Sequence, residues 1–313
     1  MTDTAQERDW SAYWQARGAA GEAFLGEGVE QHPALAAHWD AVFAAAPEDA
    51  AVLDVATGAG SVLKRAHAAG LAHLTGTDVS RAALDLMQKA LPDAGAVEAP
   101  ADAVPLPDAG FDLVTSQFGF EYAGPDAALE MLRLTKPGGT LAALGHLRGS
   151  VIEREVAANA ETAAAVQRTG FSPAARRLIE AEFAVRRTGE GQDAARAAQS
   201  AFQGPEAALA MAIAKEPQGL GAHLYHGFRQ LYQKQRAYDL ADITGWLDGM
   251  DREVAAFEGR MRTMRTAAMD EGAMQALTSR LTEAGAAEAG FEPMTLPGEA
   301  GPSCWVLSAR KAQ

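Results

Sequence analysis

The stretch best suited to bind a ligand is residues 52–60, which reads Val-Leu-Asp-Val-Ala-Thr-Gly-Ala-Gly. An apolar strand pattern runs into a turn with Gly58 and Gly60, and a helix pattern follows from Ser61. Because glycine has no Cβ, the backbone of this turn can pass close to a ligand. Asp54 lies at the carboxyl end of the predicted strand, which is the edge where open α/β sheets bind their ligands.

A second carboxylate follows the next predicted strand, where residues 74–77 lead into Asp78. That spacing suits an acceptor for the hydroxyls of a nucleoside ribose. The turn fits a pyrophosphate cradle poorly, because a dinucleotide fingerprint is G-x-G-x-x-G, whereas Ala56, Gly58 and Gly60 give A-x-G-x-G. A nicotinamide dehydrogenase is therefore disfavoured.

These residues need a sheet whose strands end at a common edge. Residues 49–146 alternate short apolar segments with helix patterns, which is typical of parallel β-α units. Two later strand patterns, 291–296 and 304–308, predict an antiparallel hairpin. The predicted fold is α/β, a doubly wound, mostly parallel, seven-stranded Rossmann-like sheet with this C-terminal hairpin and a large helical insertion. The first five strands are expected at 51–56, 72–77, 95–99, 111–116 and 140–145.

The insertion is predicted to be a set of helices that forms a cap on the ligand side of the sheet, because it follows the carboxyl end of a strand. Ser172-Pro173 predicts a helix start, and Gly189–Gln192 predicts a break between helices. One helix carries an apolar stripe at spacings of three and four, which predicts that it packs in a core. The stripe consists of Ile243, Leu247, Met250, Val254, Phe257, Met261 and Met264.

Composition limits the other classes of function. The 313 residues are 48% hydrophobic, which suffices for one large domain or a domain with an appendage, and no apolar run is long enough to span a membrane. The net charge of −14 disfavours nucleic acid as a partner, and the arginine-rich segments, such as 260–265, are interleaved with acids and are interpreted as solvated helix faces. The polar start of the chain and the single Cys304 favour a cytoplasmic location.

Four segments, 52–60, 77–80, 101–119 and 134–141, together resemble the class I S-adenosylmethionine-dependent methyltransferases. The resemblance covers roughly residues 40–146 and 275–310 and is strongest to quinone-biosynthesis-like small-molecule methyltransferases. Ala56 replaces the first glycine that the family usually has. The chain is therefore predicted to have three parts: an N-terminal helical lid and a cofactor-binding domain, which the resemblance implies, and the helical insertion as an acceptor-binding cap, which the resemblance does not cover. Their predicted bounds are 1–48 for the lid, 49–146 with 275–313 for the domain, and 147–274 for the cap.

The resemblance also implies roles in binding S-adenosyl-L-methionine, whose product is S-adenosyl-L-homocysteine. Asp78 would accept hydrogen bonds from the ribose hydroxyls and Asp54 would act on the methionine ammonium. Asp102 would accept from the adenine amino group, and the Ala103 N–H would donate to the ring. Structural roles, as turn acceptors or caps, stay open for Asp54, Asp78 and Asp102. The complete set expected at the cofactor is Tyr13, Asp54, Ala56, Gly58, Gly60, Asp78, Val79, Asp102, Ala103 and Gln117.

The family reaction is an in-line methyl displacement, which needs a general base only when the oxygen, nitrogen or carbon nucleophile arrives protonated. His146 follows the fifth strand, and Glu121 and Tyr122 follow the fourth, so these three are the catalytic candidates, with structural hydrogen bonding as the alternative. No metal site is expected, because His223 and His226 lack a third ligand nearby.

The expected partner is a small-molecule acceptor, with no nucleic acid and no membrane span. Two alternative functions stay open: an RNA or protein methyltransferase, and a non-catalytic subunit that binds the cofactor. The oligomeric state is also open, with a homodimer built on the insertion as one option. The aromatic segment around Trp10, Tyr13 and Trp14 is interpreted either as a helix that closes over the cofactor or as core packing.

Overall fold

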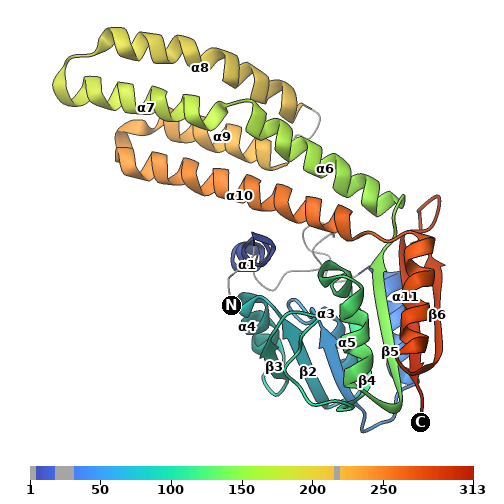
Figure 1. Cartoon of the computed structure of the whole chain (residues 1–313). Coiled ribbons are helices and arrows are strands. Elements are labelled where there is room, and N and C mark those ends of the chain that lie inside the picture. Colours follow the sequence, from blue (N-terminus) through green and yellow to red (C-terminus); the bar gives the residue numbers. More distant parts are fainter. Residues whose placement is uncertain (1–4, 18–31, 215–218) are drawn as a thin grey trace. The chain divides into compact units, whose positions relative to one another are not determined.

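The computed structural model describes residues 5–17, 32–214 and 219–313, so parts of the predicted lid, 1–4 and 18–31, lie outside the described residues. The chain forms two compact units (Figure 1). The first, which we call the sheet unit, contains Met1–Val156 and Thr263–Gln313, and the second, the helical unit, is Ala157–Arg262. The boundaries between them lie inside two long helices, α6 (Val151–Arg168) and α10 (Leu240–Ala267).

The sheet unit is built on a seven-stranded sheet with the strand order β3-β2-β1-β4-β5-β7-β6. The first five strands are parallel, and β7 is antiparallel to both β5 and β6, so the predicted doubly wound sheet with a C-terminal hairpin is confirmed. The strands are β1 (Ala51–Val55), β2 (His73–Asp78), β3 (Gly95–Glu98), β4 (Phe111–Gln117), β5 (Thr135–His146), β6 (Ala286–Met294) and β7 (Cys304–Lys311).

Two strands begin five residues earlier than predicted, β5 at Thr135 and β6 at Ala286. The start of β5 was hidden because its first residues read as a turn, yet Thr135 pairs with Phe111 before the ladder shifts register and resumes at Thr140. The strand order reverses between β1 and β4, and the crevice at the carboxyl ends of such strands is where doubly wound folds bind ligands.

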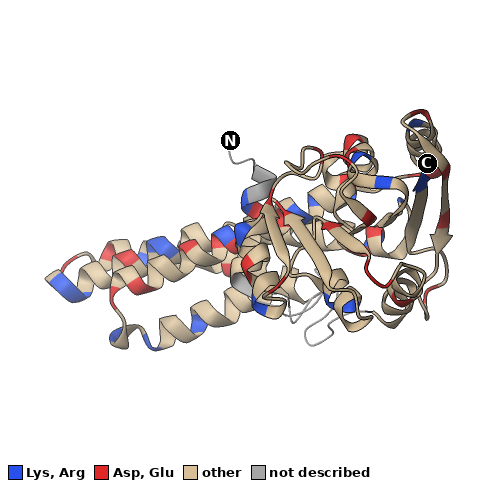
Figure 2. Cartoon of the chain, turned by 90° about the horizontal axis from the view of Figure 1, so that it is seen from below, with Lys and Arg blue, Asp and Glu red and all other residues tan. Residues whose placement is uncertain are grey.

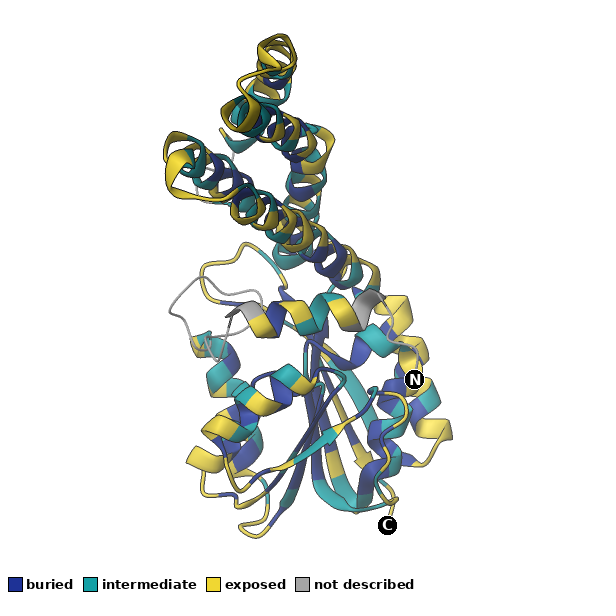
Figure 3. Ribbon diagram, turned by 90° about the vertical axis from the view of Figure 1, so that its left-hand side faces the viewer, coloured by how far each residue is buried: buried dark blue, intermediate teal, exposed yellow. Residues whose placement is uncertain are grey.

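Helices pack on both faces of the sheet because successive residues of a strand point to opposite sides. Val52 belongs to a cluster with Trp39 of α2, whereas the next residue, Leu53, packs with Met131 of α5. The resulting burial of the strands is visible in Figure 3. The helices of this unit are α1 (Ala5–Arg17), α2 (Pro33–Ala44), α3 (Ser61–Ala68), α4 (Arg81–Ala90), the 3-10 turn η1 (Phe120–Ala123), α5 (Pro125–Leu134) and α11 (Glu271–Glu283).

The helical unit consists of most of α6 and α10 together with shorter helices that have their own apolar core. Phe171, Phe202 and Phe228 meet in it, with ring centroids 5.2 to 5.6 Å apart. The predicted stripe lies on α10, and its residues are buried or half-buried, so its interpretation as a core face is confirmed. The remaining elements are α7 (Phe171–Thr188), α8 (Gln192–Ile213), α9 (Leu220–Gln233) and the 3-10 turn η2 (Gln235–Ala237).

Two predictions about this unit were wrong in detail. The helix predicted to start at Ser172-Pro173 begins one residue earlier at Phe171, and Gly170, at a φ of 66°, occupies the N-cap. The arginine-rich segments are only partly solvated: Arg262 pairs with Glu258 at 3.2 Å, but Arg260 is 8% exposed. Elsewhere acidic and basic residues are interspersed along the helices (Figure 2). Within the described ranges, no helix is long and apolar enough to cross a membrane.

Candidate active site

The turn between β1 and α3 has a left-handed backbone at three residues: φ is 55° at Ala56, 54° at Gly58 and 78° at Gly60. Ala56 adopts this conformation at a cost of about 1–2 kcal/mol that a glycine would avoid. Its methyl group lies against Gly119, because a Cβ added to Gly119 would be 2.4 Å from the Cβ of Ala56. The alanine that departs from the family pattern is thus accommodated by a glycine at the end of β4, a role that the sequence did not reveal.

An aromatic helix covers this turn. A Cβ on Gly58 would lie 2.7 Å from Cζ2 of Trp14, so the indole of α1 rests directly on the backbone of the turn. Trp14 is buried together with Tyr13, Ala59 and Ala83. The segment that the sequence left between two interpretations therefore packs over the ligand edge of the sheet unit.

Two buried carboxylates, Asp54 and Asp78, lie at the ends of β1 and β2, with 2% and 8% of their surfaces exposed. Asp54 accepts a hydrogen bond from Oγ1 of Thr115 at 2.8 Å. Asp78 accepts one backbone N–H on each oxygen, from Gly58 at 2.9 Å and from Ser80 at 2.8 Å. The loop amides therefore orient the Asp78 carboxylate and leave further lone pairs on both oxygens.

Burial controls the charge of these groups. It raises the pKa of Asp54 to about 7 and that of Asp78 to about 6, because desolvation disfavours the ionised form. Among the described residues no lysine, arginine or histidine forms an ion pair with either carboxylate. A ligand that is cationic and rich in hydroxyl groups would supply the positive charge and the hydrogen-bond donors that these two carboxylates lack among the described residues.

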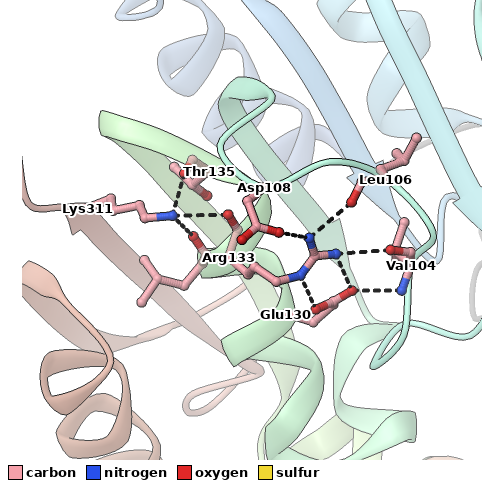
Figure 4. Close-up of polar contacts among 8 residues, drawn as sticks. Val104, Leu106, Asp108, Glu130, Arg133, Thr135 and Lys311 are labelled. Atoms are coloured by element: carbon pink, nitrogen blue, oxygen red, sulfur yellow. Dashed lines mark hydrogen bonds and ion pairs between the residues drawn. The ribbon is translucent and has the colours of Figure 1, made fainter.

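The loop after β3 holds Asp102 and Ala103, both exposed, and the Ala103 N–H donates to the Pro100 carbonyl at 3.2 Å. Two side chains of α5 hold the residues that follow (Figure 4). Glu130 accepts the Val104 N–H at 2.8 Å. Arg133 donates to the carbonyl of Val104 at 3.0 Å.

Arg133 also donates to the Leu106 carbonyl at 3.0 Å and contacts the Asp108 carboxylate. Lys311 of β7 in turn donates to three carbonyls at the end of α5 and the start of β5, among them that of Thr135 at 2.8 Å. Sequence reasoning missed this network. Its one local signal was the pair Glu130 and Arg133, three residues apart on a helix whose only other charged residue is Asp126.

A second cluster lies where β4 and β5 end. One oxygen of Glu121, Oε1, accepts the backbone N–H of His146 at 3.0 Å and lies 2.7 Å from its Nδ1. Both side chains are buried, with 1% and 3% exposed. An ionised Glu121 carboxylate can only accept, so Nδ1 is then the donor of this hydrogen bond, and in the neutral imidazole Nε2 carries the lone pair. Nε2 of His146 and Oε2 of Glu121 have no hydrogen-bond partner among the described residues.

Aromatic rings surround the imidazole. Phe118 lies 4.7 Å from the His146 ring and Tyr122 lies 5.7 Å from it, and Tyr122 also contacts Trp10 of α1 at 5.5 Å. Burial, together with the charge of Glu121, raises the pKa of the Tyr122 hydroxyl well above its usual value. Tyr122 therefore stays protonated and can donate a hydrogen bond, but it is a poor base.

The predicted site residues thus form two neighbouring groups and an outer loop. The first group gathers around the β1 turn and Asp78, with Val79 half-buried beside it, and the second gathers around His146. The groups meet where Ala56 touches Gly119. Gln117, at the end of β4, accepts a hydrogen bond from Nε1 of Trp39 at 2.6 Å, which orients its amide.

Comparison with known proteins agrees with this geometry. Residues 53–143 match the family described as "Methyltransferase domain". The chain is 41% identical over 92 residues to a demethylmenaquinone methyltransferase of Renibacterium salmoninarum, covering 29% of this chain and 38% of that protein. It is 41% identical over 101 residues to a ubiquinone/menaquinone biosynthesis C-methyltransferase of Burkholderia orbicola, covering 30% and 42%.

The chain therefore spans about two fifths of the length of the curated relatives that it matches. Among solved structures, an S-adenosylmethionine-dependent methyltransferase of Mesorhizobium loti is 26% identical, with a TM-score of 0.31 over 36% of this chain and 54% of that chain. The fold and the matched residues define residues 53–143 as a methyltransferase domain of the class I type. The cofactor of that class is S-adenosylmethionine.

The residues present fit this cofactor. It carries a sulfonium and an ammonium, and Asp54 and Asp78 are buried carboxylates that pair with no cation of the described residues. It has no phosphate, which agrees with a turn that lacks the third glycine. Gly58 and Gly60 have a left-handed backbone at the same edge, where the Trp14 indole covers Gly58.

Proposed function

We propose that this protein transfers the methyl group of S-adenosylmethionine to a small-molecule acceptor with an oxygen, nitrogen or carbon nucleophile. The observation that carries the proposal is the buried pair of Glu121 and His146, whose Nε2 has no partner among the described residues. Such a pair serves proton abstraction. It lies where β4 and β5 end, and β4 is the neighbour of β1, whose carboxyl end carries Asp54.

In this proposal the chain holds the cofactor through acidic and backbone groups. Asp78 accepts from the ribose hydroxyls with the lone pairs that Gly58 and Ser80 leave free, and Asp54 attracts the ammonium. Asp102 and Ala103 contact the adenine, for which the Ala103 N–H must leave the Pro100 carbonyl. The other residues predicted at the cofactor, which line the same edge, are Tyr13, Ala56, Gly60, Val79 and Gln117.

The bound cofactor supplies an electrophilic methyl group. The protein's own part is to bring the nucleophile into line and to remove its proton. His146 accepts that proton at Nε2, and Glu121 holds the ring in the required tautomer and stabilises the imidazolium that forms. Tyr122 donates a hydrogen bond to the acceptor, while the rings of Phe118 and Trp10 exclude water. We assign the choice of acceptor to residues 147–274.

Binding of the cofactor is the first test. Titration calorimetry with S-adenosylhomocysteine, with NAD as the control, should show binding of the first compound alone. Binding of neither would contradict the proposal.

The base is tested by turnover against a panel of phenols, amines and activated carbon acids. Glu121→Gln and His146→Gln should each lower kcat by about 10²–10⁴-fold, the contribution typical of a general base. Their affinity for S-adenosylhomocysteine should stay at the wild-type value, which also shows that the variants are folded. His67→Gln, on an exposed residue of α3, is the matched control. Wild-type kcat in both site variants would remove His146 from the mechanism.

A further inference from the structure

The helical unit contains a cavity of about 670 Å³ that the proposed methyl transfer does not use. Its wall is formed by the second half of α7, the start of α8, the end of α9 and η2. Every wall residue lies between positions 182 and 237, inside the unit Ala157–Arg262. The volume falls within the range of about 300–1,000 Å³ that small-molecule sites occupy.

The wall is basic although the chain carries a net charge of −14. It contains Arg186, Arg196, Lys234 and Arg236. Arg196 is paired with Asp193, but within the described ranges no carboxylate lies at ion-pair distance from the other three. Like charges gathered around one cavity repel one another, and a bound anion removes that cost.

One of these cations is held in place. The guanidinium of Arg186 lies over the ring of Phe183, 3.7 Å from its centroid, and donates to the Gln235 carbonyl at 3.4 Å. A cation that is ordered before a ligand arrives loses less conformational entropy on binding it.

The single carboxylate of the wall, Glu182, is already engaged. It accepts from the Tyr232 hydroxyl at 2.6 Å and from Nε2 of Gln235 at 2.8 Å. Burial and Glu182 raise the pKa of Tyr232 to about 12, so its hydroxyl adds no negative charge. Oε1 of Gln235 is buried without a hydrogen-bond partner in the described part of the chain.

The remaining wall contains the apolar residues Val185, Ala195 and Ala237, together with Gln192 and Gln233. We propose that this cavity is a second ligand site, which binds a small organic anion: a carboxylate, sulfonate or phosphate group on an apolar body. The cations bind the anionic group and the aliphatic wall covers the body.

The probe is 1-anilinonaphthalene-8-sulfonate, an organic anion that fluoresces when it is bound, and N-phenyl-1-naphthylamine is its uncharged counterpart. Both are titrated into the full chain. The double variant Arg186→Gln/Arg236→Gln should weaken binding of the anion by about ten-fold or more, the scale expected for lost charged hydrogen bonds. Binding of the neutral probe should change by less than about two-fold, because the apolar wall is intact.

Arg187→Gln is the matched control, because Arg187 is the next residue of the same helix, is exposed and lies outside the wall. Octanoate should displace the anionic probe, whereas octanol should not. The proposal is overturned if the wall and control variants bind the anion equally, or if both probes weaken together in the wall variant. Displacement by inorganic phosphate as effective as by octanoate would refute the apolar part of the site.

Discussion

Replacing Asp78 by asparagine tests the cofactor site where the structure is most specific. Each oxygen of the carboxylate accepts one backbone N–H, from Gly58 on one side and from Ser80 on the other. Asparagine has only one accepting oxygen, so its NH₂ group must face one of these N–H donors. The substitution therefore removes the charged acceptor proposed for the ribose and also disturbs the turn that carries Gly58.

The magnitude follows from these contacts. A hydrogen bond to a charged group contributes about 1.5–3 kcal/mol, so the loss of that acceptor should raise the Kd for S-adenosylhomocysteine by about 10- to 150-fold. The effect on stability should be smaller, because two changes oppose each other. One buried N–H loses its acceptor, but the variant no longer buries a carboxylate whose pKa burial raises to about 6.

The assay is titration calorimetry of S-adenosylhomocysteine into the wild type and two variants. Asp85→Asn is the control, because Asp85 is 61% exposed on α4 and pairs with Arg81 at 2.7 Å. Thermal unfolding of the same samples shows that each variant is folded. If Asp78→Asn is folded and binds with wild-type affinity, the placement of the ribose at Asp78 is refuted.

Two further predictions concern the same edge of the sheet. Affinity for S-adenosylhomocysteine should fall as the pH is lowered through about 7 and then about 6, because Asp54 and Asp78 take up protons in that order. A neutral carboxyl group does not attract the ammonium of the ligand. The measurement is calorimetry between pH 5 and 8, a window of about three units around these pKa values, and an affinity that does not change with pH would contradict the prediction. Gly119→Ala should lower the free energy of unfolding by about 1–3 kcal/mol, because the new Cβ would lie 2.4 Å from that of Ala56. Adding Ala56→Gly should restore part of the loss, and an unchanged melting temperature in the single variant would argue against the contact.

Much of the sheet was predictable because its pattern is local. A buried strand such as β1 is a short apolar run, and the start of α3 follows from a glycine turn, so both lie within a residue of their expected positions. The start of β5 was not predictable, because the Lys-Pro-Gly-Gly segment reads as a turn until its pairing with β4 is known.

The site divides in the same way. Asp54 and Asp78 could be placed from sequence because each lies in the last two residues of a strand whose carboxyl end is the expected ligand edge. The contact of Glu121 with the backbone and the ring of His146 could not be predicted from sequence, because it joins residues 25 positions apart and depends on where η1 packs. The same holds for Arg133 and the loop that it binds, and for Trp14 and Gly58.

The sequence by itself determined the class of fold, the ligand edge of the sheet and the acidic residues at that edge, since strand periodicity and turn glycines act over a few neighbouring residues. The tertiary structure decided which residues contact one another: Gly119 lies against Ala56, Glu121 lies beside His146, and cationic side chains gather around the cavity of the helical unit. Such contacts depend on how side chains from distant segments pack, and packing is a property of the whole fold that no local pattern encodes.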